Sequence, residues 1–136
     1  MTATPQADVA SLVERYRAGF ATLDPEMLVA MWDQDHDGLV YVALELAEPL
    51  HGWPAIEDYY RRVAVEHPAD EVLEMRVDDL TVDLLGDVAL AFARFHFVGS
   101  LPGSDEPFVA DGRVTFVCHR VGGDWSVIHY HESAPP

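Results

Sequence analysis

Hydrophobic positions in the first half of the chain repeat with helical spacing. Residues 8–22 place apolar side chains every three or four positions, which predicts an amphipathic helix. Asp24-Pro25-Glu26 combines an N-cap, a proline in the first turn and an acid, and predicts a short second helix ending near Trp32. Gly52-Trp53-Pro54 begins a third helix, which ends before Pro68 because the residue preceding a proline avoids helical geometry.

After this helix the hydrophobic pattern changes to the alternation of strands. Turn signals stand at Gly86-Asp87 and Gly122-Gly123-Asp124 and separate long alternating runs. Strands are expected at 39–44, 72–85, 88–98, 108–121 and 125–133. Helices followed by a run of strands predict an α+β fold, in which three helices pack on one face of a curved, mostly antiparallel sheet. The length of 136 residues predicts a single domain over 1–136.

Alternation within the later strands separates an inner face from an outer one. A wholly apolar set is expected to line the interior, and Val114, Phe116 and Cys118 form such a set. On the last strand, Ile128, Tyr130 and Glu132 are predicted to point inward, and His129 and His131 outward. In the strand 88–98 one face carries Leu90, Phe92, Arg94 and His96.

Composition excludes several kinds of chemistry and several kinds of partner. All eight basic residues are arginine, so a Schiff-base lysine and a phosphate-loop lysine are absent from the sequence. The net charge of −16 repels nucleic acid and anionic membranes, and neither is expected as a partner. Cys118 stands alone and cannot form an internal disulfide. No run of 18 uncharged apolar residues occurs, and the expected location is the cytoplasm. No organic cofactor motif is present, and no cofactor is expected.

Two stretches carry a family resemblance: HGWPAIEDYYRRV at 51–63 and GRVTFVCHRVGGDWSVIHYHESAPP at 112–136. Together with the order of elements they resemble the NTF2-like superfamily, the cone-shaped fold of ketosteroid isomerase, scytalone dehydratase and SnoaL-type polyketide cyclases. The ending W-x-x-x-H-Y-H-x-S and the segment GDVALAFARFHF at 86–97 are similar to the association (hub) domain of calcium/calmodulin-dependent protein kinase II. The resemblance implies the cone-shaped α+β fold over nearly the whole chain, whereas function varies widely on such a fold.

The resemblance to the hub domain implies positions for a pocket. Its pocket arginines align with Arg94, Phe116 and Glu132, of which this chain keeps Arg94 as the cation. Arg94 is expected either to form an ion pair with Glu132 or to anchor a substrate carboxylate. Glu132 is read either as a general base whose pKa is raised in an apolar cone or as a strand-end acid in solvent.

Further candidates complete the predicted site. Tyr16 lies in VERY, similar to the V-Q-R-Y of ketosteroid isomerases with its oxyanion-stabilising tyrosine, and is read as a hydrogen-bond donor or as a core tyrosine. The isomerase's base aspartate falls near Val42, where no acid stands, which argues against steroid isomerisation as such. The remaining expected substrate-binding residues are His96, Phe116, Tyr130 and Trp53.

Histidines on the later strands suggest an interface rather than a metal site. His96, His119, His129 and His131 lack flanking ligands at metal-binding spacing, and no metal is predicted. Asp33, Asp35 and Asp37 resemble the start of a calcium loop, but position twelve is Leu44, and the run is read as a solvated loop. Val117, Trp125 and Val127 are expected on the outer face, which predicts a homodimer.

These residues support two functional hypotheses. The first is a pocket protein that binds a small molecule, a carboxylate among the candidates, and moves a proton next to a carbonyl as a cofactor-free isomerase, lyase or cyclase. In it Tyr16 and Glu132 are catalytic. The alternative is a non-catalytic ligand-binding or oligomerisation module similar to the kinase association domain.

Overall fold

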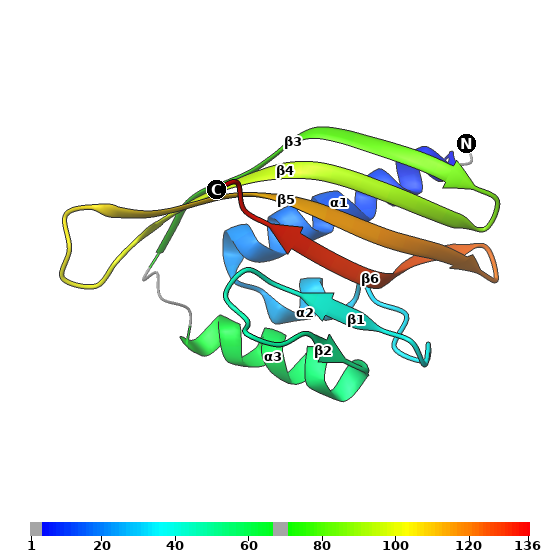
Figure 1. The fold of residues 1–136 in the computed structure, drawn as a ribbon, viewed down its shortest axis with the longest axis horizontal. Coiled ribbons are helices and arrows are strands. Elements are labelled where there is room, and N and C mark those ends of the chain that lie inside the picture. The colour runs from blue at the N-terminus through cyan, green and yellow to red at the C-terminus, as the bar shows by residue number, and fades with distance from the viewer. Residues whose placement is uncertain (1–3, 67–70) are drawn as a thin grey trace.

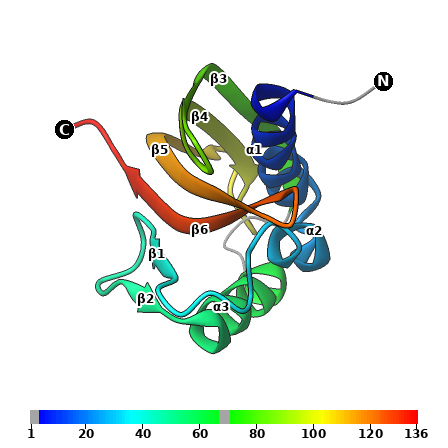
Figure 2. The ribbon, with the colours of Figure 1, turned by 90° about the vertical axis from the view of Figure 1, so that its right-hand side faces the viewer.

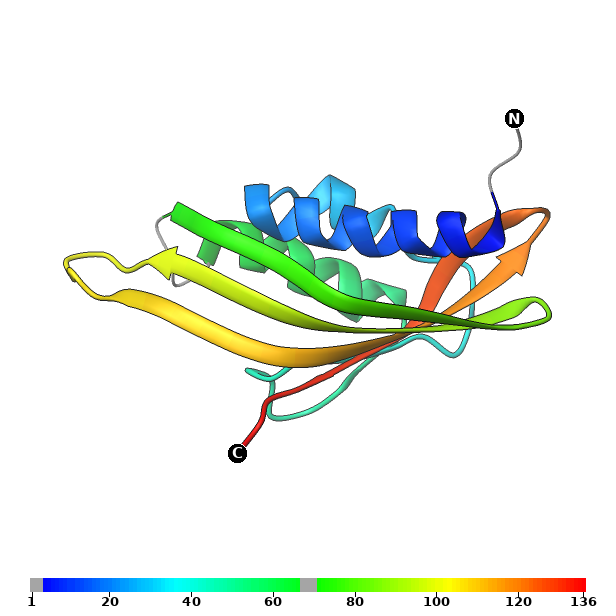
Figure 3. The ribbon, with the colours of Figure 1, turned by 90° about the horizontal axis from the view of Figure 1, so that it is seen from above.

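In the part of the chain that the structure describes, three helices cover one face of a six-stranded sheet that curves around them (Figures 1, 2 and 3). The structure is a computed structural model and describes residues 4–66 and 71–136. Pro68, where the third helix was expected to stop, lies outside the described residues. The helices are α1 (Pro5–Thr22), α2 (Pro25–Val29) and α3 (Trp53–Glu66). The strands are β1 (Val40–Val42), β2 (Leu50–His51), β3 (Glu71–Leu85), β4 (Val88–Ser100), β5 (Pro107–Val121) and β6 (Asp124–Ser133).

Local sequence signals set the helix starts and the hairpins. The Thr4 hydroxyl accepts a hydrogen bond from the Ala7 N–H at 3.1 Å and caps α1, while the Asp24 carboxylate caps α2. Each helix then has a proline in its first turn. Gly86 and Gly122 adopt φ of 68° and 60° at the β3–β4 and β5–β6 turns, a conformation that favours glycine. The predicted α+β fold is confirmed.

Sheet order brings the two halves of the chain together. The strands lie in the order β2-β1-β6-β5-β4-β3, and all neighbours are antiparallel except β1 and β6, which are parallel. Tyr41 of β1 therefore lies opposite Tyr130 of β6 in the sheet. The short strands β2 and β1 and the last strand β6 therefore lie side by side at one end of the sheet.

The inner face of β4 differs from the prediction. Its buried side chains are those of Ala89, Ala91, Ala93, Phe95 and Phe97, so the alternate set with Arg94 and His96 lies on the outer face. The buried set is wholly apolar, and its three alanines have no exposed surface beneath the helical layer. The inner set thus satisfies the rule that a charged side chain stays out of an apolar interior.

The alternation along β6 is interrupted by a bulge. Cys118 pairs with Val127 and Val117 pairs with His129, which leaves Ile128 as the extra residue. Trp125 and Val127 are buried before the bulge, and Tyr130 is buried after it. The predictions of an outward Trp125 and an outward Val127 are therefore wrong, whereas Ile128 is half-buried and packs against the core. Tyr130 points to the helices as expected.

Large apolar side chains remain on the outer face of the sheet. Leu90 and Phe92 of β4 are 38% and 41% exposed, and their neighbours across the ladder are Val117 and Thr115 of β5. Within the described residues, no helix combines the length and the apolar character needed to cross a bilayer.

Candidate functional site

A cavity of about 290 Å³ lies between the helices and the inner face of the sheet. Six elements, α1, β1, α3, β4, β5 and β6, supply aromatic rings to its wall. Where one element supplies two rings, helical spacing of i and i+4 or strand spacing of i and i+2 keeps them on one face. The aromatic lining residues are Tyr16, Phe20, Tyr41, Tyr59, Phe95, Phe97, Phe108 and Tyr130. Leu44, Val63, Met75 and Ala110 complete the apolar wall. The charged lining residues are Glu45, Arg62, Glu66 and Glu132.

Glu132 is an acid in the cavity wall that contacts the buried Tyr130. One carboxylate oxygen accepts a hydrogen bond from the Leu44 N–H at 2.9 Å, and the other accepts one from the Tyr130 hydroxyl at 2.6 Å. Desolvation raises the pKa of Glu132 to about 7, against the lowering effect of these two hydrogen bonds and with added repulsion from Glu45. A carboxyl that titrates near neutrality can both take up and return a proton.

Two tyrosines extend this contact into a chain of hydroxyl groups. The hydroxyl oxygens of Tyr130 and Tyr16 are 3.4 Å apart. Tyr130 has a single hydroxyl proton, which faces Glu132, so Tyr16 is the donor between the two tyrosines. Burial raises the pKa of both phenols, and they remain protonated donors at physiological pH.

Aromatic packing holds the hydroxyl chain in place. The ring of Tyr41 stacks on Tyr130 with centroids 4.5 Å apart and an interplanar angle of 6°. Phe116 packs edge-on against Tyr16 at 5.2 Å and against Tyr130 at 5.3 Å. Phe116 is fully buried behind the wall and is not among the lining residues. It supports the tyrosines rather than facing the cavity.

The structure separates the predicted site residues into two groups. Tyr16, Tyr130 and Glu132 come together in the cavity wall. The expected contact between Arg94 and Glu132 is wrong, because Arg94 projects from the outer face with 66% of its side chain exposed. The Arg94 guanidinium lies 3.6 Å from Asp79.

Two other residues that were predicted to bind substrate also lie outside the cavity wall. His96 is on the outer face, where its Nδ1 is 2.5 Å from the Asp111 carboxylate and its Nε2 is 3.7 Å from Glu74. Trp53 stands at the first position of α3 and is not among the lining residues.

Several lining residues escaped sequence reasoning. Tyr41 and Leu44 belong to the segment LVYVAL and Tyr59 to the stretch at 51–63, and the sequence linked none of them to the site. Phe95 and Phe97 could have been found from their strand, since they continue the wholly apolar alternate set begun by the alanines. The contact from the Leu44 N–H had no sequence signal, because it comes from a turn far from Glu132 in the chain.

The fold, with helices packed on one face of a curved sheet, defines an NTF2-like protein. The SnoaL-like domain model matches residues 9–136, and the chain belongs to this family. A comparison with curated proteins found no match.

Solved structures give the same fold. An NTF2-like protein of unknown function from Pseudomonas putida is 26% identical, with 98% of this chain and 90% of that chain covered and a TM-score of 0.78. The CaMKII hub of S. rosetta is 18% identical, with 99% and 100% covered and a TM-score of 0.79. A hexachlorocyclohexane dehydrochlorinase is 13% identical, with 96% and 85% covered and a TM-score of 0.76. The last two likenesses show the fold alone.

Proposed function

We propose that the cavity binds a neutral, largely apolar carbonyl compound and that Glu132 moves a proton next to its carbonyl group. The observation that carries this proposal is the position of Glu132, a carboxyl with a pKa of about 7, hydrogen bonded to Tyr130 in the wall of an aromatic cavity. The proposed reaction class is cofactor-free isomerisation, dehydration or cyclisation, for which proton transfer is the shared step.

Glu132 and Tyr16 have separate roles in such a step. Ionised Glu132 takes a proton from the carbon beside the carbonyl, and the C–H electron pair moves to the carbonyl oxygen as an enolate. The Tyr16 hydroxyl donates a hydrogen bond to that oxygen, because its 3.4 Å contact with Tyr130 is long and is readily exchanged for a better acceptor. Protonated Glu132 then returns the proton to another carbon or to a leaving hydroxyl.

The charge of the cavity favours a neutral ligand. Arg94, the expected anchor for a carboxylate, is outside the cavity. Arg62 lines it but is bound to Asp58 at 2.9 Å and is 54% exposed. Glu45, Glu66 and Glu132 contribute three acids to the same wall, and a ligand carboxylate would be repelled.

Ligand binding is tested with 2-naphthol, a flat apolar probe whose fluorescence reports its surroundings. We expect saturable binding that is lost in Ala110→Phe, which fills the cavity, and kept in the matched control Val109→Phe, since Val109 is 50% exposed. Equal binding by both variants would refute the cavity as the binding site.

Proton transfer is tested separately with 2-tetralone, a bicyclic ketone with exchangeable hydrogens beside its carbonyl. Nuclear magnetic resonance in D2O measures the rate at which these hydrogens are replaced by deuterium. We expect the protein to accelerate the exchange and Glu132→Gln to abolish the acceleration. If naphthol binds in the cavity but exchange stays at the buffer rate, the cavity is a binding site without this chemistry.

A second proposal concerns the outer face of the sheet, which we propose pairs with a second copy. Leu90, Phe92 and Val117 form a neighbouring apolar group there, and the fold is shared with a CaMKII hub. Light scattering is expected to give twice the chain mass of 15.1 kDa. Phe92→Asp should produce monomers, whereas Val65→Asp on α3, itself 85% exposed, should not. A wild-type particle of single-chain mass would refute the dimer.

We place the protein in the cytoplasm, since its single buried cysteine needs no oxidising compartment.

A further inference from the structure

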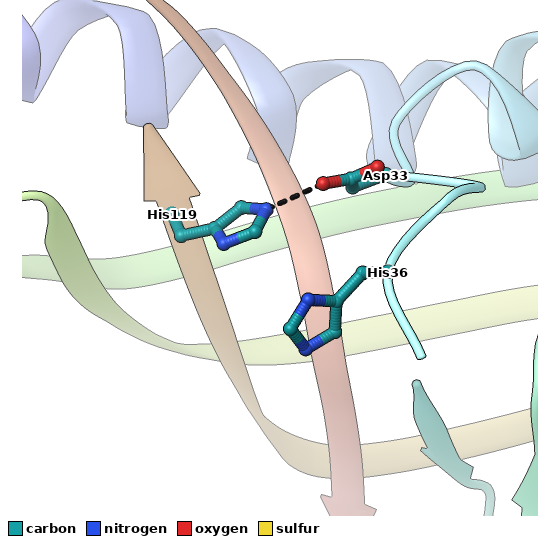
Figure 4. A group of neighbouring side chains, drawn as sticks. All are labelled: Asp33, His36 and His119. Carbon is teal, nitrogen blue, oxygen red and sulfur yellow. Dashed lines mark hydrogen bonds and ion pairs between the residues drawn. The ribbon is translucent and has the colours of Figure 1, made fainter. Parts of the chain in front are cut away.

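Asp33, His36 and His119 converge at a point separate from the cavity (Figure 4). Asp33 and His36 lie in the segment between α2 and β1, and His119 lies near the end of β5. Each offers one ligand atom, and these atoms are all within 4.8 Å of one another. The closest pair is His119 Nε2 and an oxygen of Asp33, 2.6 Å apart.

Backbone contacts fix the segment that carries two of the three residues. The Asp33 N–H donates to the Val127 carbonyl at 3.1 Å, and the Val127 N–H donates to the Met31 carbonyl at 2.8 Å. These bonds attach the segment to β6. The second oxygen of Asp33 accepts from the Asp35 N–H at 3.1 Å, which orients the first oxygen toward His119. The His36 N–H donates to the Asp33 carbonyl at 3.2 Å and closes the turn.

We propose that Asp33, His36 and His119 form a binding site for a divalent transition-metal ion of the Zn²⁺ type. Imidazole nitrogen and carboxylate oxygen are ligands that such ions prefer, and two histidines with one carboxylate leave a coordination position open. The metal replaces the hydrogen that His119 and Asp33 now share. Bonds of about 2 Å place ligand atoms roughly 3 Å apart. The three atoms lie within 4.8 Å of one another, so a bound ion would draw them closer together.

Partial burial and charge also suit a cation. The side chains of His119 and Asp33 are 18% and 22% exposed, so they are held but reachable from solvent. Asp35 and Asp37 flank His36, and the chain carries a net charge of −16, which attracts cations to this surface. A bound ion would connect the 33–38 segment to β5.

His36 distinguishes a metal site from a purely structural contact between His119 and Asp33. The hydrogen bond between His119 and Asp33 is sufficient to hold the segment against β5 without a third group. His36 adds an edge-on ring contact to His119, with centroids 5.0 Å apart, and brings a second imidazole to the same point. If the hydrogen bond between His119 and Asp33 only holds the segment against β5, His36 has no role in metal affinity. A metal site requires that His36 contribute to the affinity.

The chain also offers a competing pair of histidines for use as a control. His129 and His131 lie two residues apart on β6, with ring centroids separated by 6.4 Å. A double variant that replaces both with alanine removes that pair and leaves the proposed site intact.

The test is titration of chelator-treated protein with Zn²⁺ by calorimetry and with Co²⁺ by visible absorption. We expect one ion per chain, a Co²⁺ spectrum of low coordination number, and at least a tenfold weaker affinity in His36→Ala. His119→Gln should weaken binding by a similar factor, while its amide can still donate to Asp33 and preserve the fold. The variant His129→Ala/His131→Ala should bind as the wild type does.

Three results would overturn the proposal. They are the absence of saturable binding, unchanged affinity in His36→Ala, and loss of binding in the His129→Ala/His131→Ala control. Circular dichroism of each metal-free variant establishes that it is folded. His36→Ala keeps the test decisive should His119→Gln fail to fold, because it leaves the hydrogen bond between His119 and Asp33 in place.

Discussion

Replacing Glu132 with glutamine should change how the stability of the protein depends on pH. The pKa of Glu132 is raised from its ordinary value of 4.5 to about 7 in the folded chain, mainly by burial. The folded state therefore holds this proton more tightly than the unfolded state does. The stabilising contribution is fully present below about pH 4.5 and is lost as the pH rises through about 7.

The magnitude follows from the size of this change. Each pKa unit corresponds to about 1.4 kcal/mol, so ionisation of Glu132 should destabilise the fold by about 3 kcal/mol above pH 8. Glu132→Gln has nearly the same volume and does not titrate. Its amide meets the two donors differently from a carboxylate, but that effect is independent of pH.

Urea unfolding followed by tryptophan fluorescence measures the free energy of unfolding from pH 4.5 to 8.5. The wild-type value minus the Glu132→Gln value should fall by about 3 kcal/mol across this window. Glu48→Gln, at an exposed position, controls for removing one charge from an acidic chain. Parallel curves for wild type and Glu132→Gln would refute a buried carboxyl that titrates near neutrality.

Three further substitutions test the geometry. Arg94→Ala should lower the free energy of unfolding by less than about 1 kcal/mol, because its carboxylate partner is also exposed; a loss of 3 kcal/mol would place it in the interior. Gly112→Ala should destabilise by about 1–3 kcal/mol in urea unfolding, since a Cβ would lie 2.3 Å from the Phe95 ring; wild-type stability would contradict that packing. Tyr130→Phe should raise the pKa of Glu132 further by removing a hydrogen bond to the ionised form. Carboxyl titration by nuclear magnetic resonance measures this change, and an unchanged or lower pKa would refute the contact.

The fold was readable from the sequence because its signals are local. The cap at Asp24 and the turn glycines Gly86 and Gly122 act within a few residues, and each is found where expected, while the cap at Thr4 begins α1 before the predicted residue 8. The change from helical spacing to alternation then fixed the order of elements.

The inner face was harder to predict because one strand offered two candidate faces. On β4 the larger apolar residues Leu90 and Phe92 share a face with Arg94, and the aligned arginine of a similar family favoured that face as the interior. The smaller alanines proved to be inside. On β6 a single bulge at Ile128 reversed the alternation of inward and outward side chains. No local residue pattern predicts such an insertion.

The metal-binding candidate was missed for a different reason. Sequence reasoning grouped His119 with other strand histidines and read Asp33 as part of a solvated loop. The residues are far apart in the chain, and the 2.6 Å contact between them depends on how the 33–38 segment lies across the sheet. Spacing rules detect ligands on one element and cannot detect ligands brought together by tertiary packing.

The parallel pairing of β1 with β6 has a consequence for the time course of folding. Leu44 and Glu132 are separated by 88 residues, and the hydrogen bond between them needs both β1 and β6 in place. During synthesis the helices and the β3–β4 hairpin can form early, but the cavity wall stays open until β6 leaves the ribosome. Closing so long a loop is entropically unfavourable, and this final strand addition is expected to be the slow step of refolding. Until it occurs, Tyr16 is present on the nascent chain without Tyr130, which accepts its hydrogen bond, and Tyr41 is present without the ring on which it stacks.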